Sequence, residues 1–152
     1  TGPGTGVADR VLTQKIEVVA AGLNYHREHL DDPFEVMRRL GGHELAAIVG
    51  AVIAARIGRV PVILDGYAAT AAAAVLHKID SSALDHCIVG HLSAEPAHSR
   101  LLECLDKSPL LDLGMRLGEA SGAVMALGVL RGAITCHTGM ASFTEAQVSR
   151  KL

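Results

Sequence analysis

The residues best suited to chemistry lie in the stretch Arg116–Ala123, where a carboxylate, Glu119, stands between Gly118 and Gly122. Glycine lets the backbone approach a ligand closely. A carboxylate on such a turn, just ahead of a long alanine-rich run, can lose part of its hydration and serve as a general base. The same position suits an acid that only stabilises the dipole of the following helix. The local sequence leaves both roles open.

Polar residues also follow two short apolar runs. Val60–Leu64 is rich in β-branched residues and ends at Asp65, and the run 85–90 leads into His91-Leu92-Ser93. Both runs read as buried parallel strands, and ligands gather beyond the carboxyl ends of such strands. Asp65 could therefore bind a ribose or merely begin a turn. Ser93 could hold a phosphate or cap the next helix.

The N-terminus offers a weaker signal. Gly2, Gly4 and Gly6 could present backbone N–H groups to a phosphate, but a plain turn explains them as well. Lys15 follows in a helical stretch and by itself reads as a solvated lysine. Neither the phosphate loop that ends in Gly-Lys-Ser/Thr nor a dinucleotide fingerprint after a strand occurs.

Other catalytic patterns are missing from the sequence. His91 and His98 are seven residues apart without a third ligand at metal spacing, so no zinc site is predicted. No Gly-x-Ser-x-Gly elbow marks a nucleophile. We therefore expect no metal in the site.

Composition narrows the class of protein. The 152 residues predict one domain, and an apolar content of 49% argues against disorder. A net charge of −2, aromatics at 3% and no Trp argue against nucleic-acid binding. The odd number of widely spaced cysteines fits buried thiols in a reducing cytoplasm (Cys87, Cys104 and Cys136).

Membrane and targeting signals are not evident. The apolar run Leu45–Ile57 is short for a bilayer and contains Arg56, and no signal peptide opens the chain, so we expect a cytoplasmic protein. The chain starts at Thr1 without Met, which suggests a processed or excised piece of something longer.

The order of the elements predicts the fold. Helices alternate with strands, which favours an α/β, Rossmann-like parallel sheet with helices on both faces. Asp32-Pro33 is a typical helix start, and Gly41-Gly42 a stop. Helices are expected over 9–29, 33–40, 43–57, 68–78, 95–105 and 120–134, strands over 60–64 and 85–90, and helical or irregular structure over 109–115.

Taken together, these segments closely resemble the nicotinate-nucleotide–dimethylbenzimidazole phosphoribosyltransferase family. The motifs that carry the resemblance span essentially the whole chain, in family order: Gly2-Pro3-Gly4-Thr5-Gly6, Gly41-Gly42-His43-Glu44-Leu45-Ala46, Val62-Ile63-Leu64-Asp65-Gly66-Tyr67, His91-Leu92-Ser93-Ala94-Glu95-Pro96, Leu111-Asp112-Leu113-Gly114-Met115-Arg116-Leu117-Gly118-Glu119 and Met140-Ala141-Ser142-Phe143.

The resemblance implies a reaction. Such enzymes transfer phosphoribose from nicotinate mononucleotide to 5,6-dimethylbenzimidazole, without a cofactor, and yield α-ribazole 5′-phosphate and nicotinate for the lower ligand of cobalamin. The ring nitrogen of the base attacks the anomeric carbon with inversion. The resemblance makes Glu119 the general base that removes the N–H proton of the benzimidazole.

The resemblance also assigns the binding residues. Lys15 and Ser93 would hold the nucleotide phosphate, with Gly4 nearby, and Asp65 would lie near the sugar. Leu117 and Gly118 would line the pocket for the aromatic base. Family members suggest a homodimer, and the apolar, small-residue helices of this chain favour association as well.

Length is the one departure, since family members are roughly twice as long. The resemblance places residues 1–152 in the C-terminal part of the large domain, with the tail 138–152 packing as a terminal helix or loop. An alternative is a non-catalytic or incomplete fragment that keeps the fold and only binds a nucleotide or a partner chain.

Overall fold

Three short strands form the centre of the structure, a computed structural model that describes residues 1–3 and 9–148. The strands β1 (Val62–Leu64), β2 (Cys87–His91) and β3 (Pro109–Leu111) pair in the order β1-β2-β3, and both pairs are parallel. Ile63 lies opposite Ile88, and His91 lies opposite Leu111. The predicted parallel α/β sheet is confirmed.

Strand β3 corrects the expectation of helical or irregular structure over 109–115. It has three residues, too few to show a strand period, and it begins with Pro109, which has no N–H to donate. Pairing with β2 is what makes it a strand, and the next ladder bond runs from the Leu92 N–H to the Leu111 carbonyl at 2.7 Å. No local pattern announces such an edge strand.

Alternation along the strands separates two faces of the sheet. Leu64, Cys87 and Val89 are buried in one core with three helices, α3 (Gly42–Ile57), α4 (Tyr67–Ile79) and α5 (Ala97–Cys104). The helices contribute mostly small or branched side chains to this core (Val49, Val52, Ala72, Ala73, Leu76 and Leu102), and the 3₁₀ turn Ser81–Leu84 closes it with Leu84.

Helix α6 (Ser121–Gly139) packs on the sheet where a strand residue lacks a side chain. A Cβ at Gly90 would lie 3.1 Å from the Ala123 Cα, so glycine lets the helix axis come close to β2. Gly122 and Ala126 of α6 are buried there. Successive strand residues alternate between the two faces, so Gly90 belongs to the face opposite Cys87 and Val89. Helix α6 therefore covers one face of the sheet and α3, α4 and α5 cover the other, as expected.

The C-terminal boundary differs from the expectation. The helix expected over 120–134 continues to Gly139, and the stretch 140–148 forms exposed turns that do not pack on the fold. The predicted packing of the tail 138–152 stays a prediction, and 149–152 lie outside the described residues. Met140, Phe143 and Val148 of this stretch are exposed apolar side chains.

The N-terminal helices follow the predicted signals with shifted ends. The Asp32 carboxylate accepts hydrogen bonds from the N–H groups of Phe34 and Glu35 and starts α2 (Pro33–Val36). Helix α1 covers Asp9–Tyr25, and Arg27–His29 is a separate 3₁₀ turn. At the expected stop the chain makes a π-helical turn, Met37–Gly41, and enters α3 without a loop.

This continuous helical stretch changes the length argument on membranes. Pro33–Ile57 has 25 residues and could cross a bilayer by length and composition alone. A mostly buried core helix of a soluble protein passes the same test; here 11% of the window is buried, and Val49 and Val52 of this stretch pack against the sheet core. The shortness of Leu45–Ile57 is therefore no longer sufficient by itself to argue against a membrane span.

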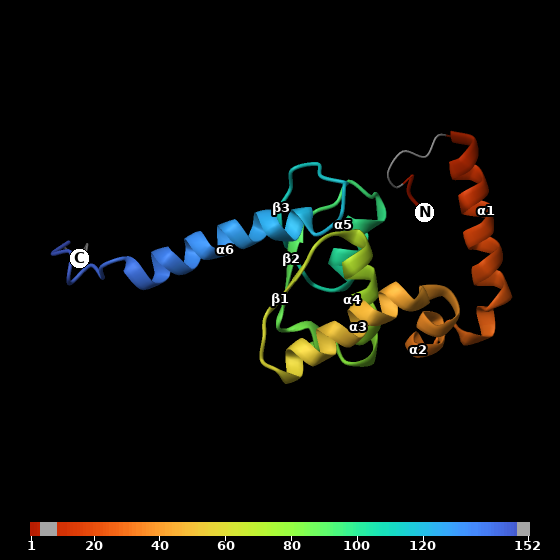
Figure 1. Cartoon of the computed structure of the whole chain (residues 1–152), viewed down its shortest axis with the longest axis horizontal. Coiled ribbons are helices and arrows are strands. Elements are labelled where there is room, and N and C mark those ends of the chain that lie inside the picture. The colour runs from red at the N-terminus through yellow and green to blue at the C-terminus, as the bar shows by residue number, and fades with distance from the viewer. Residues whose placement is uncertain (4–8, 149–152) are drawn as a thin grey trace.

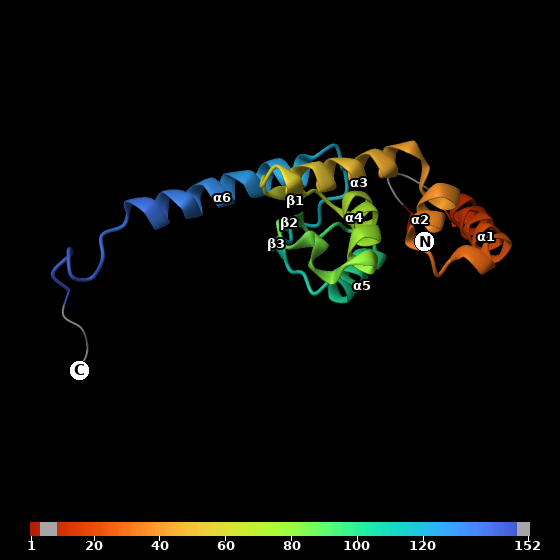
Figure 2. The ribbon, with the colours of Figure 1, turned by 90° about the horizontal axis from the view of Figure 1, so that it is seen from below.

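The outer helices extend from the α/β unit in opposite directions. Figure 1 shows α1 at one end and the blue end of α6 at the other, and Figure 2 shows the same arrangement from below. Both helices expose apolar side chains (Val11, Ile16, Val18, Val19 and Leu23 on α1; Val124, Met125, Val129 and Ile134 on α6). Exposed apolar faces of this extent mark surfaces that another chain segment covers.

Candidate active site

A cavity of about 840 Å³ opens where the strands β1 and β2 end. Its walls come from the loops after β1, after β2 and before α6, with additions from α1, α3 and the N-terminus. This is the position at which parallel α/β sheets bind ligands. The cavity brings together Lys15, Asp65, Ser93, Gly118 and Glu119 of the predicted site.

Glu119 reaches the cavity through an unusual turn. Gly118, Glu119 and Ala120 have φ values of 82°, 56° and 60°, all in the left-handed region. That conformation is natural for glycine and costs the two other residues of order 1–3 kcal/mol each. The surrounding fold holds the strain, and a strained turn at a cavity is typical of a functional site.

Glu119 does not cap α6 through a hydrogen bond within the described residues. Ala120 is the N-cap of α6 and makes no side-chain cap bond. The capping acceptor is instead Asp65, whose Oδ1 accepts from the Ala123 N–H at 2.8 Å. Within the described residues no hydrogen bond engages the Glu119 carboxylate, so the group is available to a ligand.

Asp65 therefore has a structural task that local sequence did not reveal. It directly follows β1, and its bond to the Ala123 N–H, 58 positions further along the chain, anchors the start of α6. Its backbone carbonyl also accepts from the His91 N–H at 3.3 Å. One carboxylate oxygen is thus engaged, although the residue still lines the cavity beside Gly66 and Tyr67.

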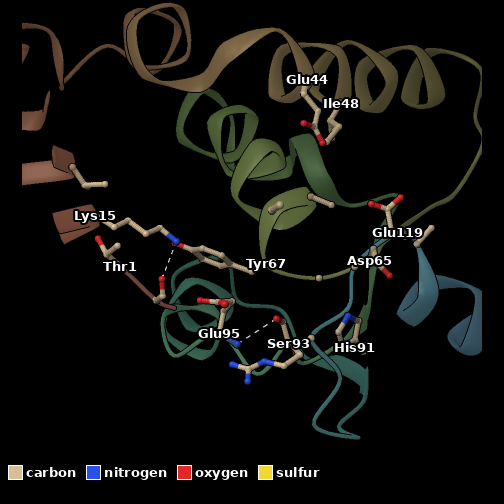
Figure 3. A pocket seen from close by; sticks show the side chains of 18 of the residues that line it. Thr1, Lys15, Glu44, Ile48, Asp65, Tyr67, His91, Ser93, Glu95 and Glu119 are labelled. Carbon is tan, nitrogen blue, oxygen red and sulfur yellow. Dashed lines mark hydrogen bonds between the residues drawn. The ribbon is translucent and has the colours of Figure 1, made fainter. Parts of the chain in front are cut away.

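Ser93 and Lys15 lie in the wall of the cavity, with polar atoms held by nearby backbone groups. The Ser93 Oγ accepts from the Glu95 N–H at 3.3 Å, which makes it a turn residue shortly before Pro96, the N-cap of α5. The Lys15 Nζ donates to the Gly2 carbonyl at 2.9 Å. Figure 3 shows Lys15 and Glu95 at one end of the cavity and Asp65, His91 and Glu119 at the other.

One predicted binding residue is not part of this wall, and another lies outside the described residues. Leu117 is 68% exposed and does not line the cavity, although its neighbours Arg116 and Gly118 do. Gly4, with Gly6, lies outside the described residues, so its predicted contact with phosphate stays a prediction.

The structure adds residues that sequence reasoning did not assign. Glu44 and Ile48 of α3 line the cavity together with Tyr67, Glu95 and Arg116. Glu44 and Glu95 lie inside motifs already quoted, but nothing in their spacing shows that they face the same space as Glu119. Four carboxylate side chains and two cationic ones thus surround the cavity.

The histidines and cysteines differ in burial and in their neighbours. Among the described residues no group of three His, Cys, Asp or Glu side chains is arranged to hold a metal ion. Cys87 is buried, which raises the pKa of its thiol, whereas Cys104 and Cys136 are exposed. The expectation of three buried thiols is therefore wrong for two of them.

Comparison with known proteins identifies the family. The DBI_PRT family model, described as phosphoribosyltransferase, matches residues 1–148. The chain belongs to this phosphoribosyltransferase family. A nicotinate-nucleotide–dimethylbenzimidazole phosphoribosyltransferase from Agrobacterium fabrum is 55% identical over all 152 residues, and one from Methylocella silvestris is 58% identical over 151.

Solved structures agree with the fold. CobT from Thermus thermophilus is 42% identical, with a TM-score of 0.90 over 99% of this chain and 44% of that one. A second structure from the same organism, a nicotinate-nucleotide–dimethylbenzimidazole phosphoribosyltransferase, has a TM-score of 0.73 and 44% identity, and covers 79% of this chain and 36% of that one. The chain spans about 44% of the length of the two curated relatives above.

Proposed function

We propose that this chain supplies the general base and much of the nucleotide site of an enzyme that transfers phosphoribose from nicotinate mononucleotide to 5,6-dimethylbenzimidazole. The products are α-ribazole 5′-phosphate and nicotinate. The proposal extends to this chain the reaction in the names of its relatives. The observation that carries it is the Glu119 carboxylate, unpaired within the described residues and held in the cavity by a strained turn.

The chemistry needs one base and no metal. One benzimidazole nitrogen attacks the anomeric carbon and forms the new C–N bond. The bond to the nicotinate nitrogen breaks, and its electron pair leaves with nicotinate. Glu119 takes the proton from the other benzimidazole nitrogen, which keeps the attacking nitrogen electron-rich. Holding both substrates in line supplies much of the remaining rate enhancement.

Lys15 and Ser93 are proposed to bind the nucleotide phosphate. A lysine ammonium has three N–H donors, so Lys15 keeps its bond to the Gly2 carbonyl while two donors remain for phosphate oxygens. Charge-assisted bonds of this kind are stronger than neutral ones. The Ser93 hydroxyl proton is free to donate, because its Oγ only accepts from Glu95. Gly4 is proposed to contribute a backbone N–H to the same phosphate.

The sugar and base would lie towards the Glu119 end of the cavity. Asp65 is proposed to accept from a ribose hydroxyl through the oxygen that does not cap α6. Gly118 borders the base, and the exposed Leu117 side chain is proposed to complete the apolar pocket together with a further chain segment.

The assembly is proposed to be a cytoplasmic homodimer. The exposed apolar faces of α1 and α6 favour association with a second copy. The three free thiols of Cys87, Cys104 and Cys136 suit a reducing compartment. We place residues 1–152 in the C-terminal part of the large domain of the longer enzyme.

The test uses a full-length chimera, in which this chain replaces the segment that it matches in the Agrobacterium fabrum relative. Glu119→Gln should lower the turnover of the chimera by about 10²–10⁴-fold, the usual contribution of a positioned base. Binding of nicotinate mononucleotide, measured by calorimetry, should change little, because Glu119 acts on the other substrate.

Glu103→Gln is the matched control, because Glu103 is an exposed carboxylate of α5 outside this cavity. It should keep the full rate. Near-normal turnover of the Glu119→Gln chimera would overturn the assignment of the base. Comparing the chimera with the 152-residue chain alone separates an enzyme part that needs completion from a module that only binds nucleotide.

A further inference from the structure

A buried histidine connects two walls of the cavity without lining it. His98, in the first turn of α5, is fully buried, as is Thr70 in the first turn of α4. The His98 Nδ1 accepts from the Ser93 N–H at 2.9 Å, and its Nε2 lies 3.2 Å from the Thr70 Oγ1. The Thr70 hydroxyl donates in turn to the Gly66 carbonyl at 2.8 Å.

The direction of each bond in this chain is determined. A backbone amide can only donate, so the His98 Nδ1 carries no proton and the proton sits on Nε2. Nε2–H therefore donates to the Thr70 Oγ1, and the Thr70 proton goes to the Gly66 carbonyl. Every polar atom of the connection has a partner, as a buried network requires.

Both ends of the connection belong to the proposed nucleotide site. Ser93 follows β2, Gly66 follows β1, and both line the cavity. Tyr67, which also lines it, meets the His98 ring edge-on with the ring centroids 6.0 Å apart. One imidazole thus sets the spacing between the two loops that end neighbouring strands.

Only neutral His98 fits this arrangement. A proton on Nδ1 would point at the Ser93 N–H and break the bond. Burial lowers the pKa of His98, and the nearby His91 lowers it further. The surroundings therefore maintain the tautomer that the geometry demands.

We propose that His98 is a positioning residue for the nucleotide, which holds the Ser93 loop and the Gly66–Tyr67 turn at the separation that nicotinate mononucleotide requires. The proposal rests on the proposed function of this cavity. His98 touches no substrate and acts through the Ser93 N–H and the Thr70 hydroxyl. Its loss should therefore affect nucleotide binding more than the chemical step.

Two amide variants of the full-length chimera separate the two bonds. An Asn side chain at 98 places an acceptor near the position of Nδ1 and keeps the Ser93 bond, whereas Gln places a donor near Nε2 and keeps the Thr70 bond. We expect His98→Gln to raise the KM for nicotinate mononucleotide about tenfold, the scale of one lost buried bond. His98→Asn should raise it less, and kcat and the KM for dimethylbenzimidazole should change less than about twofold, because neither bond reaches the reacting atoms.

Thr70 provides a rescue test. Thr70→Val removes the hydroxyl at similar volume and should raise the same KM, whereas Thr70→Ser keeps the hydroxyl and should restore it. His86→Asn is the control: the His86 Nε2 bonds the Val52 carbonyl at 3.0 Å, away from the cavity, and Asn places no donor there, so it should lower only the melting temperature. Equal rises in both KM values for His98→Gln, or no change, would overturn the proposal.

Nucleotide binding measured without turnover keeps the two proposals apart. If the unmodified chimera binds nicotinate mononucleotide but transfers nothing, the proposed function fails, and the Kd values of the His98 variants still decide the positioning role. If the unmodified chimera does not bind nicotinate mononucleotide, both proposals fail.

Discussion

The two ends of α6 have opposite surroundings. At its start Gly122 and Ala126 are buried, Ala123 lies against Gly90 of β2, and Asp65 caps the helix. From Arg131 to Gly139 every residue is exposed, Ile134 to 61%. One helix thus runs from a site into open space, and an apolar helix end in water indicates a surface that another chain covers.

Helix α1 shows the same contrast between buried and exposed parts of the molecule. It lies apart from the sheet in Figures 1 and 2 and exposes Val11, Val18 and Leu23, yet its Lys15 lines the cavity opposite Glu119. The Glu119 side of the site rests on the closed α/β unit. The Lys15 side rests on a helix that the unit buries poorly. The proposed base and the proposed phosphate site therefore differ in how far the described α/β unit supports them.

The largest effect is expected at the free end of α6. In the chimera, Val129→Lys with Ile134→Lys should weaken dimerisation at least about a hundredfold, because a two-fold interface meets each new charge twice and like charges cost several kcal/mol. Light scattering over a concentration series measures this. The exposed pair Ser99→Lys and Ser108→Lys adds the same charge outside α6 and is the control for charge alone. A dimer that survives the first pair would place the interface elsewhere.

A smaller effect, on the free energy of unfolding, is expected at the packed end of α6. Gly90→Ala should lower the free energy of unfolding by about 1–3 kcal/mol, since its Cβ would crowd the Ala123 backbone and the Leu64 carbonyl. Gly50→Ala on α3 meets open space and should instead stabilise the protein by roughly 0.5–1 kcal/mol. Denaturant titration of both variants checks the sign. Equal effects would mean that α6 does not pack closely on β2.

The smallest predicted effect is the pH dependence of the free energy of unfolding. The pKa of His98 lies below its ordinary value of 6.5 in the folded state because of burial and His91, so the unfolded chain binds the proton more readily. Stability from neutral His98 is fully present above pH 6.5 and declines as the pH falls below it. The stability difference between wild type and His98→Asn should therefore shrink between about pH 7.5 and about pH 5. A constant difference would show that His98 titrates normally.

Sequence reasoning succeeded where short-range chemistry decides the structure. Asp32-Pro33 starts a helix because a carboxylate satisfies free N–H groups two and three residues on. The apolar runs before Asp65 and His91 became β1 and β2, because they suit a sheet that is covered on both faces. Strand β3 and the length of α6 were missed, since both depend on contacts with β2 or with solvent rather than on a local period.

By itself the sequence determined the α/β class, the family and part of the cavity wall (Lys15, Asp65, Ser93, Gly118 and Glu119), because residue types and their order along the chain carry that information. The tertiary structure alone decided which of those residues stay free. Asp65 could have bound a ribose or begun a turn, and it caps α6. Glu119 could have been a base or a charge for the helix dipole, and it stays unpaired within the described residues. His98 had no partners at metal spacing, and it joins two loops. These roles depend on partners as far as 58 residues away, and only folding brings such groups within hydrogen-bond distance.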